Sequence, residues 1–315
     1  MITDSLIIDG LNFYMRHFAA NPSMGDNGQP IGGIVGFLKG IQLLCERCMP
    51  KSVTVVWEGG GSPRKRAISK NYKGGRKPQG LNRYYQDIPD TVENRNYQLM
   101  LLIELLRLLP VRQLYIGDCE ADDIIGQMCI YKPESEAVVI VSSDRDYYQL
   151  LSDDVRIWSP GRKVFVSSCD VKDQYYVSQA NFLTTRAFVG DPSDGLSGIK
   201  GAGFKTLAKR FPELCDEVFT SVEDILKLSL GRSKASKLKL FREINENNDV
   251  PRTNWRAMYL GDRNLSAGQI VKLRYSLANE LPKLNKLAFI RTLLREEIKG
   301  FNIDRLYFAL KCIRD

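Results

Sequence analysis

The chain has 315 residues, of which 43% are hydrophobic and 26% charged, a composition typical of a globular protein that is long enough for two domains. Its 45 Lys and Arg against 37 Asp and Glu give a formal net charge of +8, which favours a polyanionic partner. The single histidine, His17, argues against Ser-His-Asp, Cys-His and paired-histidine catalysis. We expect His17 to be a structural residue near the start of a helix.

Seven cysteines, an odd number spread along the chain, do not have the pattern of a disulfide framework. Cys45 and Cys48 form one Cys-x-x-Cys without a second pair, so we expect two small residues on a buried helix face rather than zinc ligands. No apolar run approaches the roughly 18 residues of a membrane span, and no leader precedes the first strand-like run. We therefore expect a cytoplasmic protein without a membrane partner.

Short apolar runs rich in β-branched residues predict strands at 5–9, 53–58, 113–117, 137–144 and 154–159. Several of these runs are apolar throughout, as in strands that are covered on both faces. Helical patterns lie between them, at roughly 31–48, 94–109 and 120–131. This alternation predicts an α/β domain over residues 1–180, with a mostly parallel central sheet and helices on both faces.

Acidic residues lie at or just after the ends of four of the predicted strands. They are Asp9, then Glu58, then Glu120, Asp122 and Asp123, and finally Asp144 and Asp146. In open α/β sheets the ligand crevice lies beyond the carboxyl ends of the strands. A single acid at such a place is usually a helix cap. Four segments that deliver acids to one crevice instead predict a metal site.

Residues 62–83 are strongly basic and contain no acid. The bases are Arg64, Lys65, Arg66, Lys70, Lys73, Arg76, Lys77 and Arg83. Such a run is most often a solvated loop, but here it directly follows Glu58, so it would place positive charge over the acidic crevice and attract a polyanion. Tyr72 in this run could either pack in the protein or stack on an unpaired base.

From about residue 180 the sequence predicts a mainly helical, basic region that extends to 315. Residues 184–211 read as a helix, a Gly-rich hairpin and a second helix that begins near Phe204. The hairpin glycines, Gly198, Gly201 and Gly203, suit positive φ and close backbone approach. Backbone amides at the start of the second helix, with Lys205 and Lys209, could hold a phosphate.

With these motifs in view, the chain resembles the 5′-nuclease family, which includes flap endonucleases, the 5′-nuclease domains of bacterial DNA polymerase I and bacteriophage 5′-exonucleases with RNase H activity. The resemblance covers roughly residues 5 to 215 and is greatest to the bacteriophage members. It rests on five motifs in the family's order: "LIIDGLN", "VVWEGGGSPRKR" with "NYKGGR", "CEADDIIG", "SSDRDYYQLL" and "VGDPSDGLSGIKGAGFKTL". The chain departs from the family in having Glu58 where an Asp is usual.

The resemblance implies a PIN-like sheet, a basic helical arch at about 59–95 and a helix-hairpin-helix that binds DNA. It also implies two-metal hydrolysis of phosphodiesters, with Mg²⁺, or Mn²⁺ in its place, held by carboxylate oxygens. The first ion would belong mainly to Asp9, Glu58, Glu120, Asp122 and Asp123, and the second mainly to Asp144, Asp146, Asp191 and Asp194. Lys73 and Arg76 match arch residues that contact the scissile phosphate.

The family's substrates imply a DNA partner with a flap, a nick or a 5′ end, an RNA–DNA hybrid, and replication proteins such as a single-strand-binding protein. The resemblance further implies K⁺ at the hairpin near residues 198–203, and we expect a monomer. Two rival hypotheses remain at this point. A PIN-type ribonuclease would share the acidic crevice but lack the segment 191–209, and a non-catalytic DNA-binding protein on the same scaffold would have lost several of the acids.

Overall fold

The structure is a computed structural model, and it describes residues 3–69, 72–74 and 92–313. Its described part contains one sheet of six strands in the order β3-β2-β1-β4-β5-β6. The strands are β1 Ser5–Asp9, β2 Ser52–Trp57, β3 Arg112–Tyr115, β4 Val138–Val141, β5 Val155–Ser159 and β6 Val164–Val166. The first five run parallel, and β6 pairs antiparallel with β5. The predicted mostly parallel α/β sheet is confirmed, and β6 is a strand that the sequence did not predict.

The central strand β1 is buried on both faces of the sheet. Leu6 and Ile8 point into one hydrophobic cluster and Ile7 into the other, which follows from the two-residue repeat of a strand. Burial of each such side chain stabilises the fold by about 1.5–3 kcal/mol. This explains why the run is apolar throughout instead of alternating with polar residues.

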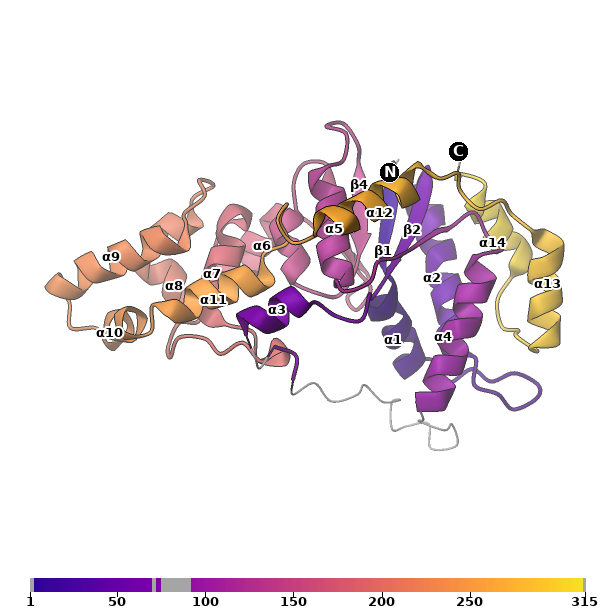
Figure 1. Cartoon of the computed structure of the whole chain (residues 1–315), viewed down its shortest axis with the longest axis horizontal. Helices are drawn as coiled ribbons and strands as arrows, with labels where there is room; N and C mark the ends of the chain where they lie inside the picture. The colour runs from indigo at the N-terminus through magenta and orange to yellow at the C-terminus, as the bar shows by residue number, and fades with distance from the viewer. Residues whose placement is uncertain (1–2, 70–71, 75–91, 314–315) are drawn as a thin grey trace.

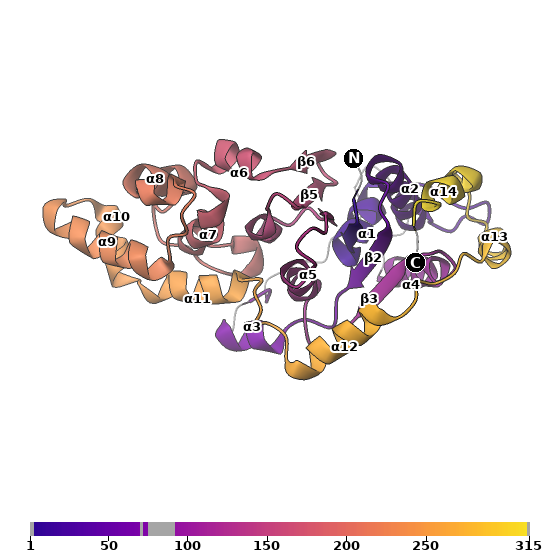
Figure 2. The same cartoon turned by 90° about the horizontal axis from the view of Figure 1, so that it is seen from above.

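Helices cover both faces of the sheet (Figures 1 and 2). One face carries α1 Gly10–Ala20, α2 Gly32–Cys48, α4 Val92–Leu106 and the C-terminal α13 Lys286–Arg295 and α14 Ile303–Leu310. The other face carries α5 Ala121–Ile130 and, beyond it, α6 Ser168–Tyr175, α7 Phe182–Val189, α8 Phe204–Arg210, α9 Val222–Ala235, α10 Lys239–Glu246 and α11 Asp249–Met258. α3 Pro63–Ile68 packs beside α11, and α12 Ala267–Ala278 connects the two ends of the molecule.

The segment 184–211 has the predicted helix, hairpin and helix, here as α7 and α8. Gly201 has φ +83°, which only glycine adopts readily. Gly198 allows the hairpin backbone to approach the end of α7, because a Cβ there would lie 1.8 Å from the carbonyl oxygen of Val189. Short 3₁₀ turns at Asp146–Leu150, Gln179–Asn181, Pro192–Asp194 and Pro212–Cys215 link the longer elements. The segment that separates this chain from a PIN-type ribonuclease is therefore present.

Two expectations about single residues have different outcomes. Cys45 and Cys48 lie in α2 and are both buried, as predicted. His17 lies in the last turn of α1 and not near the start of a helix, because the helix already begins at Gly10, where Asp9 caps it. None of the described helices is long and apolar enough to cross a bilayer.

The predicted boundary at residue 180 lies in the turn Gln179–Asn181, between the last strand and the helix-hairpin-helix. The last helices return to the sheet side, since Phe289, Leu306 and Leu310 belong to the same hydrophobic cluster as α1 and α2. Figure 1 shows α13 and α14 at the end of the molecule opposite α9 and α10. The two-domain division itself stays a prediction.

Candidate active site

The sheet topology brings the sequence-distant acids together. β1 lies between β2 and β4, so the chain changes direction across the sheet at the β1–β4 boundary. Asp9 ends β1 and Asp144 follows β4, which places both at this switch point, where open α/β sheets bind their ligands. Glu58 follows the neighbouring β2, and Glu120 is the N-cap of α5.

Asp9 is buried at the end of β1. Its carboxylate accepts hydrogen bonds from the Ser142 hydroxyl (3.1 Å), the Tyr147 hydroxyl (3.2 Å) and the Asn12 amide (3.3 Å). Burial, and then the negative charge of Asp144, raise the pKa of Asp9 to about 7. A carboxylate so placed gains stability from any cation that enters the crevice.

Glu120, Asp122 and Asp123 surround the ammonium group of Lys65, and we call these three acids the α5 acids. Lys65 Nζ lies 3.0 Å from Glu120 Oε2, 2.8 Å from Asp122 Oδ2 and 3.3 Å from Asp123 Oδ1. Burial acts to raise the pKa of Glu120, but Lys65 and Lys73 outweigh it and hold that pKa at about 2. Burial and then Asp122 raise the pKa of Asp123 to about 6. The crowded acids of "CEADDIIG" are thus partly neutralised by a buried lysine.

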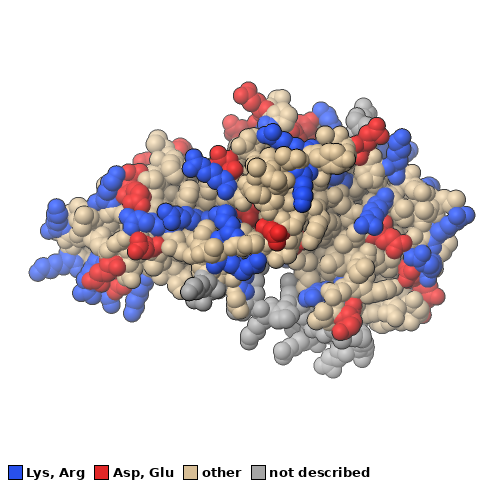
Figure 3. Space-filling model, in the orientation of Figure 1, with Lys and Arg blue, Asp and Glu red and all other residues tan. Residues whose placement is uncertain are grey.

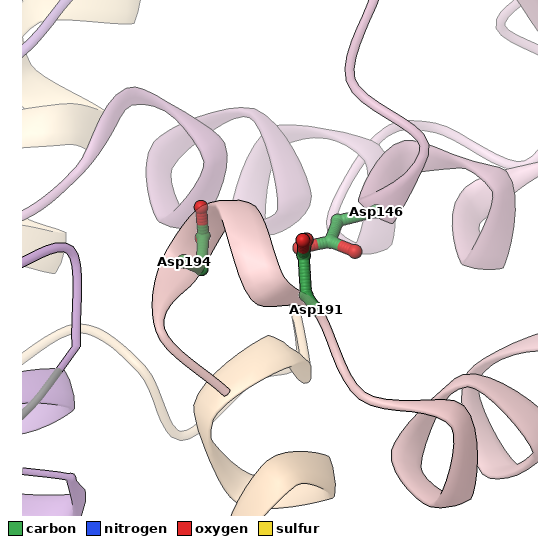
Figure 4. A group of neighbouring side chains, drawn as sticks. All are labelled: Asp146, Asp191 and Asp194. Carbon is green, nitrogen blue, oxygen red and sulfur yellow. The ribbon is translucent and has the colours of Figure 1, made fainter. Parts of the chain in front are cut away.

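Asp146, Asp191 and Asp194 form a second group, and we call them the hairpin acids. One carboxylate oxygen from each lies within 4.8 Å of the others (Figure 4). Asp191 and Asp194 come from the tight turn between Gly190 (φ +80°) and Gly195 (φ +73°), where positive φ folds the chain back on itself.

Arg186, one turn before the end of α7, reaches the hairpin acids. Its Nε lies 2.7 Å from Asp146 Oδ1 and its Nη2 2.5 Å from Asp191 Oδ2. Each of the two acidic groups therefore contains at least one buried or largely buried cation of the protein.

Electrostatic coupling joins the two groups into one site. Burial and then Asp122 raise the pKa of Glu58, to about 7. Burial raises the pKa of Asp144, and the negative charges of Asp122 and Asp194 raise it further. Burial and then the charge of Asp144 raise the pKa of Asp146. These electrostatic effects between acids from different strand ends fit the prediction that the acids meet at one edge of the sheet.

The residues fit divalent cations. Carboxylate oxygens are the ligands that Mg²⁺ prefers. The buried oxygen Asp123 Oδ2 has no hydrogen-bond partner among the described residues. An oxygen of this kind, in a crevice where anions raise one another's pKa, is expected where a cation binds.

Lys73 and Tyr72 lie at the edge of the crevice. Lys73 Nζ is 2.8 Å from Glu120 Oε2, and its backbone amide donates to the carbonyl of Asp194 at 2.8 Å, so this residue touches both acidic groups. The Tyr72 hydroxyl donates to Glu120 Oε2 at 2.9 Å, and its side chain is buried. Of the two alternatives that the sequence left open for Tyr72, packing in the protein fits this placement and stacking on a base does not. Arg76 lies outside the described residues.

The predicted nucleic-acid contacts have mixed outcomes. The contact of Lys65 is corrected: its side chain is fully buried because it neutralises the α5 acids. Arg66, Lys205 and Lys209 are exposed, and Arg64 is half-buried. Gly198, Gly201 and Gly203 are all exposed at the hairpin, and the backbone of Gly198 lies close to Val189 at the end of α7. The remaining predicted contacts, Lys70, Lys77 and Arg83, lie outside the described residues.

Sequence reasoning missed three residues that hold the site together. Arg186 pairs with the hairpin acids, and the only signal for it is its position five residues before Asp191. Asn264 donates to Asp123 Oδ1 at 2.8 Å. Gln149 donates to the carbonyl of Met258 at 3.0 Å and accepts from the amide of Leu260 at 3.0 Å. Gln149 lies in the motif "SSDRDYYQLL", whereas Asn264 has no signal in the sequence, and only the fold shows the partners of both.

Comparison with curated proteins gives several relatives. The chain is 28% identical over 242 residues to a "5′-3′ exonuclease" of Buchnera aphidicola, a match that covers 75% of this chain and 79% of that protein. It is 29% identical over 247 residues to the "Flap endonuclease Xni" of Shewanella loihica, covering 76% and 86%. It is 31% identical over 237 residues to a thermostable DNA polymerase I of Thermus thermophilus, but spans only 26% of that longer protein.

Solved structures share the fold. A bacteriophage T5 flap endonuclease, solved with DNA and metal ions, superposes with a TM-score of 0.66 at 20% identity, covering 94% of this chain and all of that one. A flap endonuclease of Methanococcus jannaschii superposes with a TM-score of 0.53 at 17% identity, covering 99% and 91%. The family model for the N-terminal resolvase-like domain of 5′-3′ exonucleases matches residues 4–180, more than half of the chain. The chain therefore belongs to the 5′-3′ exonuclease family of 5′ nucleases.

Proposed function

We propose that this chain is a structure-specific 5′ nuclease that hydrolyses phosphodiester bonds near 5′ ends, as a 5′-3′ exonuclease and flap endonuclease in DNA replication and repair. The observation that carries the proposal is the carboxylate cluster of Asp146, Asp191 and Asp194, whose oxygens lie within 4.8 Å of one another. The raised pKa values of Asp9, Glu58 and Asp144, to which neighbouring acids contribute, support a wider acidic site around this cluster. Membership of the 5′-3′ exonuclease family supports the same reaction.

The α5 acids, with Asp9 and Glu58, would hold one Mg²⁺, and the hairpin acids, with Asp144, a second. Mn²⁺, which also accepts oxygen ligands, would substitute. When bound, such ions supply an activated water and stabilise the leaving oxygen of the phosphodiester. The separate clustering of the hairpin acids supports the proposed division of ligands.

The chain's own cations would bind and orient the substrate. Lys73 has 22% of its side chain exposed and bridges the two acidic groups, so its ammonium is placed to contact a phosphate that lies over the crevice. A fixed positive charge there stabilises negative charge that develops on the phosphate oxygens. Arg76 is proposed to act beside it.

DNA is the proposed partner, gripped along its phosphate backbone by the exposed bases of the helix-hairpin-helix. Lys205 and Lys209 lie on α8, on its exposed side. Phosphate contacts of this kind position a protein without reading sequence. The same proposal includes K⁺ at residues 198–203 and an RNA–DNA hybrid as a second substrate. It also includes a single-strand-binding protein as a partner, a monomeric state and a cytoplasmic location.

The test is cleavage of 5′-labelled flap, nicked and RNA–DNA substrates, with Mg²⁺ or with EDTA. We expect short products that carry the 5′ label, formed only with Mg²⁺, and their loss in Asp146→Asn. Asp153→Asn is the matched control, because Asp153 is an exposed acid a few residues away in the chain. Products in EDTA, or equal cleavage by both variants, would refute the proposal.

A further inference from the structure

A cavity of about 440 Å³ lies between α3 and the C-terminal end of α11, beside the α5 acids. Six of its lining residues matter here: Arg64, Trp255, Arg256, Tyr259, Asp262 and Arg263. Its size lies in the range of small-ligand sites. Of the predicted site residues that the structure describes, only Arg64 lines it, so the cavity lies beside the acidic crevice and not within it.

The cavity is positively charged. Arg64, Arg256 and Arg263 outnumber the single acid, Asp262. Figure 3 shows Lys and Arg side chains gathered over α11 and α3 on this face of the molecule. A site with this charge favours an anionic ligand, and arginine suits phosphate in particular because its planar donors match phosphate oxygens.

Buried donors in the cavity have no acceptor. The Nε and Nη2 groups of Arg64 and the Nε1–H of Trp255 make no hydrogen bond within the described part of the chain. Among the described residues, Arg64 donates a hydrogen bond only through Nη1, to the carbonyl of Arg256 at 3.2 Å, while its Nη2 makes a long ion pair with Asp123 Oδ1 at 3.7 Å. Unsatisfied buried donors are costly, so a ligand that brings acceptor oxygens would stabilise this arrangement.

The cavity also offers aromatic surface. The rings of Trp255 and Tyr259 stack with centroids 4.4 Å apart and planes 15° apart, and both residues are only half-buried. The Tyr259 ring lies directly against Gly261, since a Cβ at that glycine would lie 1.8 Å from it. Aromatic rings beside arginines are the combination that binds unpaired nucleotides, through stacking on the base and ion pairing with the phosphate.

Hydrogen bonds connect the wall of the cavity to the part of the sheet edge that carries the acids. Gln149, which follows Asp146 by three residues, hydrogen-bonds the backbone on both sides of Tyr259. Asn264 donates both to the carbonyl of Tyr259 and to Asp123. A nucleotide bound in the cavity would therefore sit at a defined position relative to the α5 acids.

From these observations we propose that the cavity between α3 and α11 is a subsite for one unpaired nucleotide, with its phosphate on Arg64, Arg256 and Arg263 and its base against Trp255. This deepens the proposed function, on which it rests, because it assigns the protein a contact to single-stranded nucleic acid outside the crevice. With this subsite, the protein would bind DNA that has an unpaired arm more tightly than DNA without one.

The experiment compares binding of two labelled DNAs by fluorescence anisotropy in EDTA: a duplex with an unpaired 5′ arm of about ten nucleotides, and a nicked duplex without one. Trp255→Ala and Arg263→Ala should each weaken binding of the armed DNA about tenfold, the size expected when one stacking or phosphate contact is lost. Binding of the nicked duplex should change less than twofold. Trp255→Phe, which keeps a ring, should restore most of the affinity.

Arg291→Ala is the matched control, because Arg291 is an exposed arginine on α13, at the far end of the molecule. Equal weakening on both DNAs, or no weakening on the armed DNA, overturns the subsite. Arg263 is exposed, so its variant tests the proposal even where Trp255→Ala fails to fold. Wild-type cleavage with Mg²⁺ is measured in parallel. If the wild type cleaves DNA but the variants bind the armed DNA as tightly as the wild type does, only the proposed subsite is refuted. A wild type that never cleaves refutes the proposed function.

Discussion

The ammonium group of Lys65 lies 2.8 Å from Asp122 Oδ2 with only 1% of its side chain exposed. Glu120 and Asp123 are also within ion-pair distance of it. Lys65 comes from α3 and the acids from α5, so this buried cluster ties the start of the basic segment to the metal-binding edge. Removal of one partner from a buried ion pair typically destabilises a protein by about 3–5 kcal/mol, because the remaining charges lose their compensation.

Lys65→Met should therefore lower the free energy of unfolding of the metal-free protein by about 3–5 kcal/mol. Methionine keeps most of the side-chain volume, so the loss reports charge and not a cavity. Urea unfolding in EDTA measures it, with Arg66→Met as the control, because Arg66 is an exposed neighbour on the same helix. Added Mg²⁺ should recover part of the loss. Equal stability of the two variants would contradict this account of Lys65.

Lys73→Ala should lower the single-turnover cleavage rate at saturating substrate by about 10²–10³, the effect of removing one donor that stabilises transition-state charge. The reason is its position between Glu120 and Asp194. Lys39→Ala, an exposed lysine on α2, should leave the rate unchanged. If Lys73→Ala weakens binding but cleaves at the wild-type rate once saturated, Lys73 contributes only general phosphate affinity.

Lys205 and Lys209 should act through salt-dependent phosphate contacts. Each contact to duplex DNA contributes about −0.9 to the slope of log affinity against log salt. The double variant Lys205→Ala/Lys209→Ala should therefore make the slope shallower by roughly 2. Lys39→Ala/Lys311→Ala, which removes two exposed lysines from α2 and the end of α14, should leave it unchanged. An unaltered slope in the first variant would remove the helix-hairpin-helix from the DNA interface.

His17 should titrate far below an ordinary histidine. Burial, with smaller contributions from Arg16 and Lys163, lowers its pKa to about 4, and its Nε2 has no hydrogen-bond partner among the described residues. The ring packs edge-on against Phe13, with centroids 4.6 Å apart, and against Gly36.

Because the folded-state pKa of His17 lies below the unfolded value of about 6.5, the neutral ring stabilises the folded protein above pH 6.5. This contribution, up to about 3 kcal/mol, is lost as the pH falls from 6.5 through 4. The chain has no other histidine, so one imidazole signal in an NMR titration reports it directly. A midpoint near 6.5 would show that the ring is not buried as described.

The sequence predicts the sheet and the acids well for a physical reason. Strands buried on both faces must be apolar throughout, and a parallel sheet places its carboxyl ends on one edge, so Asp9 and Asp144 had to meet. Side chains whose partners are set only by tertiary packing were not predictable. Lys65 and Arg66 are adjacent bases in the sequence, yet one is buried among acids and the other is exposed. The partners of Arg186 and Asn264 are likewise set only by the fold.

The most direct test of the central claim is equilibrium binding of Mn²⁺ to the metal-free protein, followed by electron paramagnetic resonance of the free ion. The wild type and Asp153→Asn should bind two ions, and Asp146→Asn should lose at least one, because Asp146 lies within 4.8 Å of Asp191 and Asp194 at their carboxylate oxygens. Mn²⁺ binding by Asp146→Asn that matches the wild type in number and affinity would contradict the claim that these acids together hold divalent metal.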